Sequence, residues 1–188
     1  MLAIKFLVVV AVCVVCIEDD RVLSMDVTMS PQVVALQHTA PTAGYTVLKT
    51  YPHRSTAWTE GLSFFHGKLY ESTGPTPYNA YSSPTLGGGL AEIDLASGRV
   101  TENVNFKDIY GEGATEIGGK WFVLSYEEGK IKEFQAKGLK PAGDFALPNG
   151  LQFQGWGATN DGERMIYSDG SSSIRYMDPQ TKKATLSF

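Results

Sequence analysis

A phrase of sixteen residues occurs three times along this chain, each time built around a glycine-containing turn. The copies read TEGLSFFHGKLYESTG (59–74), GEGATEIGGKWFVLSY (111–126) and, more divergent, GWGATNDGERMIYSDG (155–170). Each copy has a residue followed by Gly near its start, then a short stretch, a turn and a second short stretch. A single hairpin needs no copies, so this repetition constrains the fold more than any other feature.

The spacing of the copies indicates the size of the repeated unit. The turn glycines Gly67, Gly119 and Gly162 are 52 and 43 residues apart, and PTPYNAYSSPTLGG lengthens a loop in the first interval. A period of about 40–50 residues with roughly four strands per unit is typical of a β-propeller blade. Helical periodicity is sustained nowhere, so we expect an all-β propeller with about three blades. A β-sandwich is the alternative, but it would not explain the repeat.

In a propeller the innermost strands line a central channel, so equivalent positions of successive blades converge. Glu60, Glu112 and Trp156 each precede a Gly at the equivalent position of their copies. The Gly lets the chain approach its neighbours where a Cβ would crowd. The repeat therefore predicts two carboxylates and an indole around one mouth. The alternative is that each Glu-Gly only starts a strand, with its carboxylate in solvent.

The N-terminus has the pattern of a secretory signal peptide. Lys5 precedes the apolar run Phe6–Ile17, which is too short for a membrane-spanning helix of roughly 20 residues. We expect a signal peptide at 1–17, with its end uncertain up to about residue 25, and a secreted product with no stable membrane insertion. An uncleaved anchor or a buried strand are the alternatives.

Both cysteines lie inside this leader, so the exported chain would carry no disulfide. Residues 18–44 show no sustained period and are expected to be a loosely ordered lead-in to a domain at 45–188. The formal net charge is −4 and the 16 Lys and Arg are scattered, so nucleic acid is not an expected partner. The three histidines have no ligand-like spacing, and neither a metal nor a cofactor is expected.

Five segments together resemble one known family, the plant and bacterial type of glutaminyl-peptide cyclotransferase. They are YPHRSTAWTEGLSF, GKLYESTG, AEIDLASGRV, YGEGATEIGGK and GWGATNDGERMIYSDGSSSIRYMDP, in this order. The similarity runs from about Tyr45 to Phe188. It implies a five-bladed propeller of which this chain carries about three blades.

The resemblance also implies an activity and a set of site residues. The free α-amine of an N-terminal glutamine, on a peptide or protein, attacks its own γ-carbonyl, ammonia leaves, and pyroglutamate remains. The family's acid/base Glu matches Glu112, which would serve both proton transfers. The family's aromatic cage matches Trp58, Tyr110 and Trp156, and a further family Trp falls on Tyr126.

This sequence departs from the family pattern at several of these positions. Glu60 stands where the family commonly has Gln, and a second carboxylate near Glu112 should raise the pKa of one of the two. Trp58 and Tyr110 replace Phe, which keeps aromatic surface but changes the size of the pocket. For Tyr110 and Tyr126, ordinary strand packing is the alternative interpretation.

The family continues for about two more blades, which carry an Asn, a Trp and a Lys of the active site. We therefore interpret the chain as either a fragment of a longer product or a degenerate copy. The competing function is a secreted, non-catalytic propeller that binds a partner. The Gly-Glu-Gly sequence around Glu112 and the aromatics favour the enzyme, whereas Glu60 and the absent blades favour the binding module.

Overall fold

The computed structural model describes residues 44–55, 57–75, 88–148 and 154–187. The expected signal peptide, almost all of the lead-in and the long loop at 76–87 lie outside these ranges. The chain divides into two units, Met1–Lys49 and Thr50–Phe188. The fold described below is that of the second unit.

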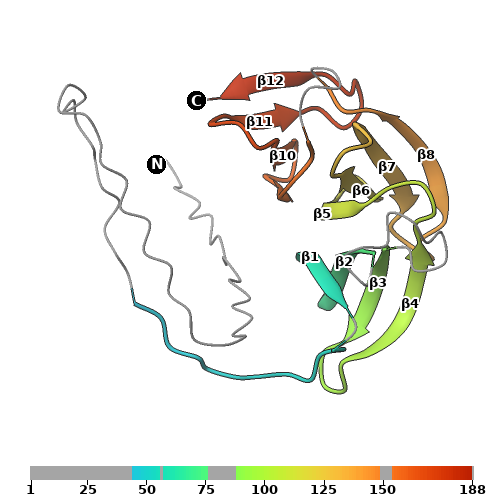
Figure 1. Ribbon diagram of the computed structural model, residues 1–188, viewed down its shortest axis with the longest axis vertical. Coiled ribbons are helices and arrows are strands. Elements are labelled where there is room, and N and C mark those ends of the chain that lie inside the picture. The colour runs from blue at the N-terminus through green and yellow to red at the C-terminus, as the bar shows by residue number, and fades with distance from the viewer. Residues whose placement is uncertain (1–43, 56, 76–87, 149–153, 188) are drawn as a thin grey trace, which may run out of the picture. The chain divides into compact units, whose positions relative to one another are not determined.

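In the described residues, twelve strands form three four-stranded sheets, and every pairing between neighbouring strands is antiparallel (Figure 1). The first sheet contains β1 (Trp58–Phe65), β2 (Lys68–Gly74), β3 (Gly89–Asp94) and β4 (Arg99–Asn105). The second contains β5 (Gly111–Ile117), β6 (Lys120–Ser125), β7 (Lys130–Gln135) and β8 (Pro141–Ala146). The third contains β9 (Ala158–Asn160), β10 (Met165–Ser168), β11 (Ile174–Met177) and β12 (Ala184–Ser187).

Within each sheet the strands follow chain order, and the first strands contact one another from sheet to sheet: β1 contacts β5, and β5 contacts β9. Figure 1 shows β4 and β8 at the outer side and β1 and β5 at the inner side. No helix occurs in the described ranges. The all-β prediction and the prediction of about three propeller blades are therefore confirmed.

Two of the three hairpins at the repeat turns have the same geometry. His66 and Gly67 have φ of 49° and 77°, and Gly118 and Gly119 have φ of 64° and 83°. Positive φ at both central residues is the requirement of a two-residue turn that matches strand twist. The third hairpin differs, because a four-residue connection, 161–164, joins β9 to β10. The divergence of the third copy in sequence therefore corresponds to a different turn.

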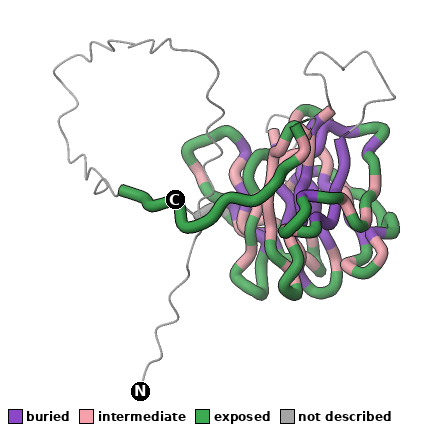
Figure 2. The backbone as a smooth tube through the Cα atoms, turned by 90° about the horizontal axis from the view of Figure 1, so that it is seen from below, coloured by how far each residue is buried: buried purple, intermediate pink, exposed green. Residues whose placement is uncertain are grey.

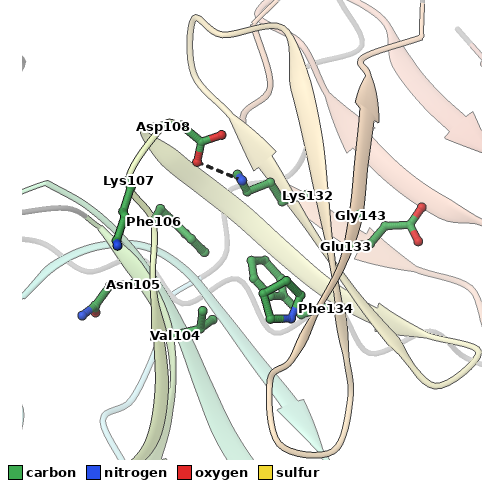
Figure 3. A pocket seen from close by; sticks show the side chains of 10 residues that line it. Val104, Asn105, Phe106, Lys107, Asp108, Lys132, Glu133, Phe134 and Gly143 are labelled. Atoms are coloured by element: carbon green, nitrogen blue, oxygen red, sulfur yellow. Dashed lines mark ion pairs between the residues drawn. The ribbon is translucent and has the colours of Figure 1, made fainter. Parts of the chain in front are cut away.

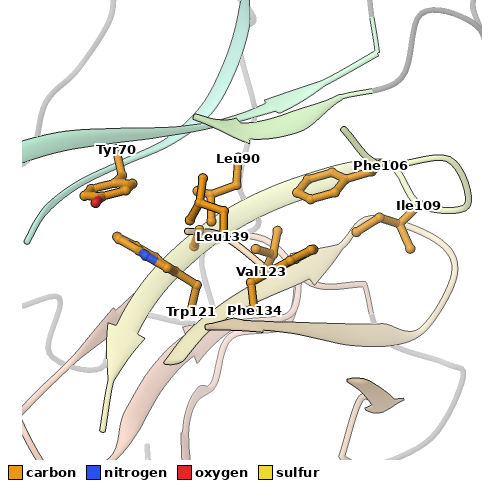
Figure 4. Close-up of a cluster of buried hydrophobic side chains, with 9 residues drawn as sticks. Tyr70, Leu90, Phe106, Ile109, Trp121, Val123, Phe134 and Leu139 are labelled. Carbon is orange, nitrogen blue, oxygen red and sulfur yellow. The ribbon is translucent and has the colours of Figure 1, made fainter. Parts of the chain in front are cut away.

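The core lies between the sheets, in two clusters on opposite faces of the middle sheet. Alternation along β6 separates them: Trp121 and Val123 belong to the cluster shared with the first sheet, and Phe122 and Leu124 to the one shared with the third. Figure 4 shows the first cluster, and Figure 2 shows the buried strands enclosed by exposed turns. A strand buried on both faces explains the continuous apolar run of β6.

Gly61, Gly113 and Gly157, which follow Glu60, Glu112 and Trp156 in the three copies, differ in how closely other atoms approach them. A Cβ on Gly61 would lie 2.6 Å from Ser72 Oγ, and one on Gly113 would lie 2.4 Å from Ala158 N and 2.5 Å from Trp156 O. The expected crowding is therefore found at both positions. At Gly157 the expectation was wrong, because a Cβ there would only touch Ser168 Oγ at 3.6 Å. In the described residues no further inner strand lies against Gly157.

These distances predict that Gly113→Ala destabilises the protein, because a backbone on β9 would have to move away from β5. We expect the free energy of unfolding to fall by about 1–3 kcal/mol. Urea denaturation measures this change. Gly157→Ala is the matched control and should change the free energy of unfolding by no more than about 0.5 kcal/mol. Equal effects of the two substitutions would contradict the described contact between the sheets.

Candidate functional site

The two glutamates at the equivalent repeat positions both lie at irregularities of an inner strand. The register of β1 against β2 shifts between Thr59 and Gly61, and that of β5 against β6 shifts between Gly111 and Ala114. Such bulges bend a strand and re-aim its side chains, and they are frequent beside active sites. The side chains of Glu60 and Glu112 therefore do not follow the regular alternation between the two faces of the sheet.

Glu60 and Glu112 come together across the boundary between the first and second sheets. The Tyr110 hydroxyl, from the segment just before β5, donates to Glu60 Oε1 at 2.6 Å. The Glu60 carboxylate also forms a hydrogen bond with Glu112 and acts on it by its charge. Tyr110 is 7% exposed, so this contact is shielded from water. The predicted convergence of the two carboxylates is therefore present.

Backbone contacts hold Glu112 where all three sheets meet. Ser72 Oγ, on β2, donates to the Glu112 carbonyl oxygen at 2.6 Å. The next residue, Gly113, donates its N–H to the Trp156 carbonyl oxygen at 2.8 Å. Ser72 therefore fixes the backbone of the central glutamate.

The pKa of Glu112 is raised from its ordinary value of 4.5 to about 8. Burial is the largest cause, followed by the charge of Glu60, a hydrogen bond with Glu60 and the charge of Glu128. The expected increase by like-charge repulsion therefore falls on Glu112, and burial adds to it. At neutral pH this carboxyl group carries its proton and can donate it.

Three aromatic rings extend from this pair of carboxyl groups. The ring centroids of Tyr110 and Tyr126 are 5.7 Å apart, and those of Tyr126 and Trp156 are 6.0 Å apart. Trp156 precedes β9 instead of lying in it, and 45% of its surface is exposed. The structure therefore joins three of the four expected aromatic residues in one chain of ring contacts, which ends at the surface.

Trp58 is the fourth expected aromatic residue, and it lies at the first position of β1, 46% exposed. Its partner in the strand ladder is Gly74. A Cβ on Gly74 would lie 2.4 Å from the Tyr110 ring, so that ring rests directly on the Gly74 backbone. The strand register thus places Trp58 beside the backbone that supports Tyr110.

Glu128 belongs to the same site, and no sequence argument identified it. Its Oε1 accepts the Tyr110 backbone N–H at 3.0 Å, and its charge contributes to the raised pKa of Glu112. In the sequence it is the second of two acidic residues before Gly129, which is the pattern of an ordinary solvated turn. No local signal distinguishes it from the exposed Glu127.

A buried carboxylate on β2 fixes the segment that leads into β1. His53 Nε2 and Thr59 Oγ1 lie 2.7 and 2.5 Å from Glu71 Oε1, and Arg54 Nη2 donates to Oε2 at 2.9 Å. Burial alone would raise the pKa of Glu71, but the hydrogen bonds outweigh it and the pKa is lowered. The ionised Glu71 therefore anchors the start of β1, where Trp58 and Glu60 lie.

A cavity of about 190 Å³ lies elsewhere, between the outer strands of the first two sheets (Figure 3). None of the residues discussed above lines it. Phe106 and Phe134 stack beside it at 5.7 Å, and Lys132 forms an ion pair with Asp108 at 2.9 Å across its rim. Its apolar residues are the outer end of the first core cluster. We therefore place the candidate site at the inner strands.

The described residues contain neither a candidate metal-binding cluster nor a candidate membrane-spanning helix. Within those residues, no group of three or more His, Cys, Asp and Glu side chains is placed to hold a metal ion. The described part of the chain also contains no helix long and apolar enough to cross a membrane.

Comparison with known proteins gives one family match and several structural matches. The family model described as glutamine cyclotransferase matches residues 21–188. Over 141 residues the chain is 30% identical to the glutaminyl-peptide cyclotransferase of Arabidopsis thaliana, covering 74% of this chain and 40% of that protein. The chain thus spans well under half the length of this curated relative.

Two solved structures show the fold. The glutaminyl cyclase of Myxococcus xanthus matches with a TM-score of 0.61 and 22% identity, over 74% of this chain and 54% of that one. The WD40 domain of Neurospora crassa Pan2 matches with a TM-score of 0.50 and 8% identity, over 69% of this chain and 35% of that one. WD40 domains are β-propellers, which agrees with the three blades described above.

The raised pKa of Glu112 predicts a particular dependence of stability on pH. The folded state holds this proton more tightly than the unfolded chain does, so the resulting stability is complete below about pH 4.5 and is lost as pH rises through about 8. Glu112→Gln removes the titrating group. Over this range the free energy of unfolding of the parent should fall relative to that of the variant.

Urea denaturation of both proteins at a series of pH values measures this difference. Glu127→Gln, an exposed neighbour with the same chemical change, should follow the parent at every pH. A constant difference between parent and Glu112→Gln would show that Glu112 titrates normally in the folded protein.

Proposed function

The chain belongs to the glutamine cyclotransferase family, and on that premise we propose that it carries the acid/base centre of a glutaminyl-peptide cyclotransferase. In this reaction the α-amine of an N-terminal glutamine attacks the side-chain carbonyl carbon. A ring C–N bond forms, the bond to the amide nitrogen breaks, and ammonia leaves. The substrates are peptides and proteins with an N-terminal glutamine.

One observation carries the proposal: a half-buried carboxyl group, whose raised pKa keeps its proton at neutral pH, lies in a site that includes three aromatic rings in contact. Glu112, with its pKa near 8, holds a proton at neutral pH and can give it to the departing amide nitrogen. The resulting carboxylate can then accept a proton from the attacking nitrogen. One carboxyl group thus serves both transfers and ends in the state in which it began.

The aromatic residues supply the other requirement, which is positioning. Ring closure is intramolecular, so an enzyme gains most by holding the amine against the carbonyl carbon. The rings of Tyr110, Tyr126 and Trp156 form a chain of contacts that starts at Tyr110, whose hydroxyl donates to Glu60, the partner of Glu112. Such a surface suits the small, largely apolar lactam ring that forms. Trp156 is 45% exposed, so this chain of ring contacts ends where a peptide can reach it from solvent.

The proposal predicts that the complete protein releases ammonia from a peptide with an N-terminal glutamine, and that Glu112→Gln slows this by about 100-fold or more. Mass spectrometry of the peptide after incubation detects the loss of ammonia, and a parallel incubation without protein measures spontaneous cyclisation. Glu127→Gln is the matched control and should retain parental turnover.

Two results would contradict the proposal. One is that protein shown to be folded releases ammonia from the peptide no faster than spontaneous cyclisation does. This result would favour the non-catalytic binding module. The other is an active protein in which Glu112→Gln turns over at the parental rate, which would move the acid/base role to another group.

A further inference from the structure

Tyr110 carries the hydroxyl that contacts Glu60, yet no regular strand holds its backbone. It lies between the end of β4 at Asn105 and the start of β5 at Gly111. Both of its backbone polar groups are held by the turn between β6 and β7. The Tyr126 N–H donates to the Tyr110 carbonyl oxygen at 3.0 Å, and the Tyr110 N–H donates to Glu128 Oε1 at 3.0 Å.

We propose that Glu128 is a positioning residue of this site: its carboxylate fixes the backbone of Tyr110 and keeps a negative charge beside Glu112. A hydrogen bond from a backbone N–H to a carboxylate is charge-assisted and about twice as strong as one between neutral groups. The position of the Tyr110 hydroxyl against Glu60, and of the Tyr110 ring against Tyr126, depends on this anchor.

The second carboxylate oxygen of Glu128 indicates that this residue does more than hold the Tyr110 backbone. Glu128 Oε2 is buried and has no hydrogen-bond partner among the described residues. Leaving a buried carboxylate oxygen unpaired lowers the stability of the fold. The amide of Gln would accept the same N–H bond at a smaller penalty, because its buried NH2 group would be unpaired but uncharged. The carboxylate at this position therefore acts through its charge as well as through its hydrogen bond.

Tyr110 connects Glu128 to the pair of carboxyl groups, because its N–H donates to Glu128 and its hydroxyl donates to Glu60. The charge of Glu128 acts on the Glu112 carboxyl. The groups that act on the Glu112 carboxyl are Glu60 from β1 and Glu128 from the β6–β7 turn, and both favour retention of its proton. The ion pairs found in the described residues involve none of these three glutamates.

This inference rests on the proposed function where it concerns turnover, because the proton kept on Glu112 is the one given to the leaving nitrogen. The arrangement of Glu128, Tyr110 and Glu112 can also be tested without any reaction. The test therefore combines a titration of Glu112 with steady-state kinetics.

The variants Glu128→Gln and Glu128→Ala separate the two roles, and Glu127→Gln is the control. The probes are the carboxyl carbon of Glu112, followed by NMR against pH with glutamate labelled in the complete protein, and a peptide with an N-terminal glutamine. Glu128→Gln keeps the acceptor for Tyr110 N–H but removes the charge. It should move the Glu112 titration, and the alkaline limb of the pH–rate profile, to lower pH and leave KM within about twofold.

Glu128→Ala removes both the charge and the anchor, so it should cause the same shift and raise KM by about tenfold. Glu127→Gln should change neither property. The proposal is overturned if Glu128→Gln leaves the Glu112 titration in place, or if Glu128→Ala, shown to be folded, keeps the parental KM. A shifted titration in a protein without turnover would support the charge role of Glu128 while rejecting the proposed reaction.

Discussion

The contact between the inner strands β1 and β5 is the constraint on which the site depends. Two serines of the first sheet hold it, since Ser63 Oγ donates to the Ala114 carbonyl oxygen at 2.7 Å and Ser72 Oγ to that of Glu112 at 2.6 Å. Close approach of β1 to β5 also requires glycine at Gly61, where a Cβ would lie 3.1 Å from Gly113 Cα and 3.2 Å from Ala114 N. These contacts place two carboxyl groups side by side, which neither sheet could do alone.

Burying two adjacent carboxyl groups opposes folding even when Glu112 keeps its proton, so other interactions must offset that cost. The middle sheet is buried on both faces by two apolar clusters. The ionised Glu71 ties the start of β1 to β2 through Thr59, His53 and Arg54. Strongly shifted pKa values concentrate at functional sites for this reason: the surrounding fold supplies the stability that the site gives up. At Glu112 the result is a raised pKa, so this carboxyl group keeps its proton at neutral pH.

The sequence predicted the repeated architecture well because repetition is a local signal. The turn residues at His66-Gly67 and Gly118-Gly119 have the φ values that their chemistry suggests, and Glu60 and Glu112 do converge. The bulges that aim the two glutamates depend on strand register, which no short motif encodes.

The roles of Ser72 and Glu128 could not be predicted from the sequence either. Ser72 contacts Glu112, which is distant in the chain, and Glu128 contacts Tyr110, which lies in an irregular connection. Gly157 shows the opposite error, since a residue equivalent in the repeat does not have an equivalent neighbour in space.

The convergence of the first two sheets at one site is tested most directly by a double-mutant cycle between Glu60→Ala and Tyr110→Phe. Urea denaturation of the parent, both single variants and the double variant gives the coupling free energy of the two side chains. The short hydrogen bond between Tyr110 Oη and Glu60 Oε1 predicts a coupling of about 1–3 kcal/mol. A coupling indistinguishable from zero would mean that the two sheets do not bring these residues together in solution.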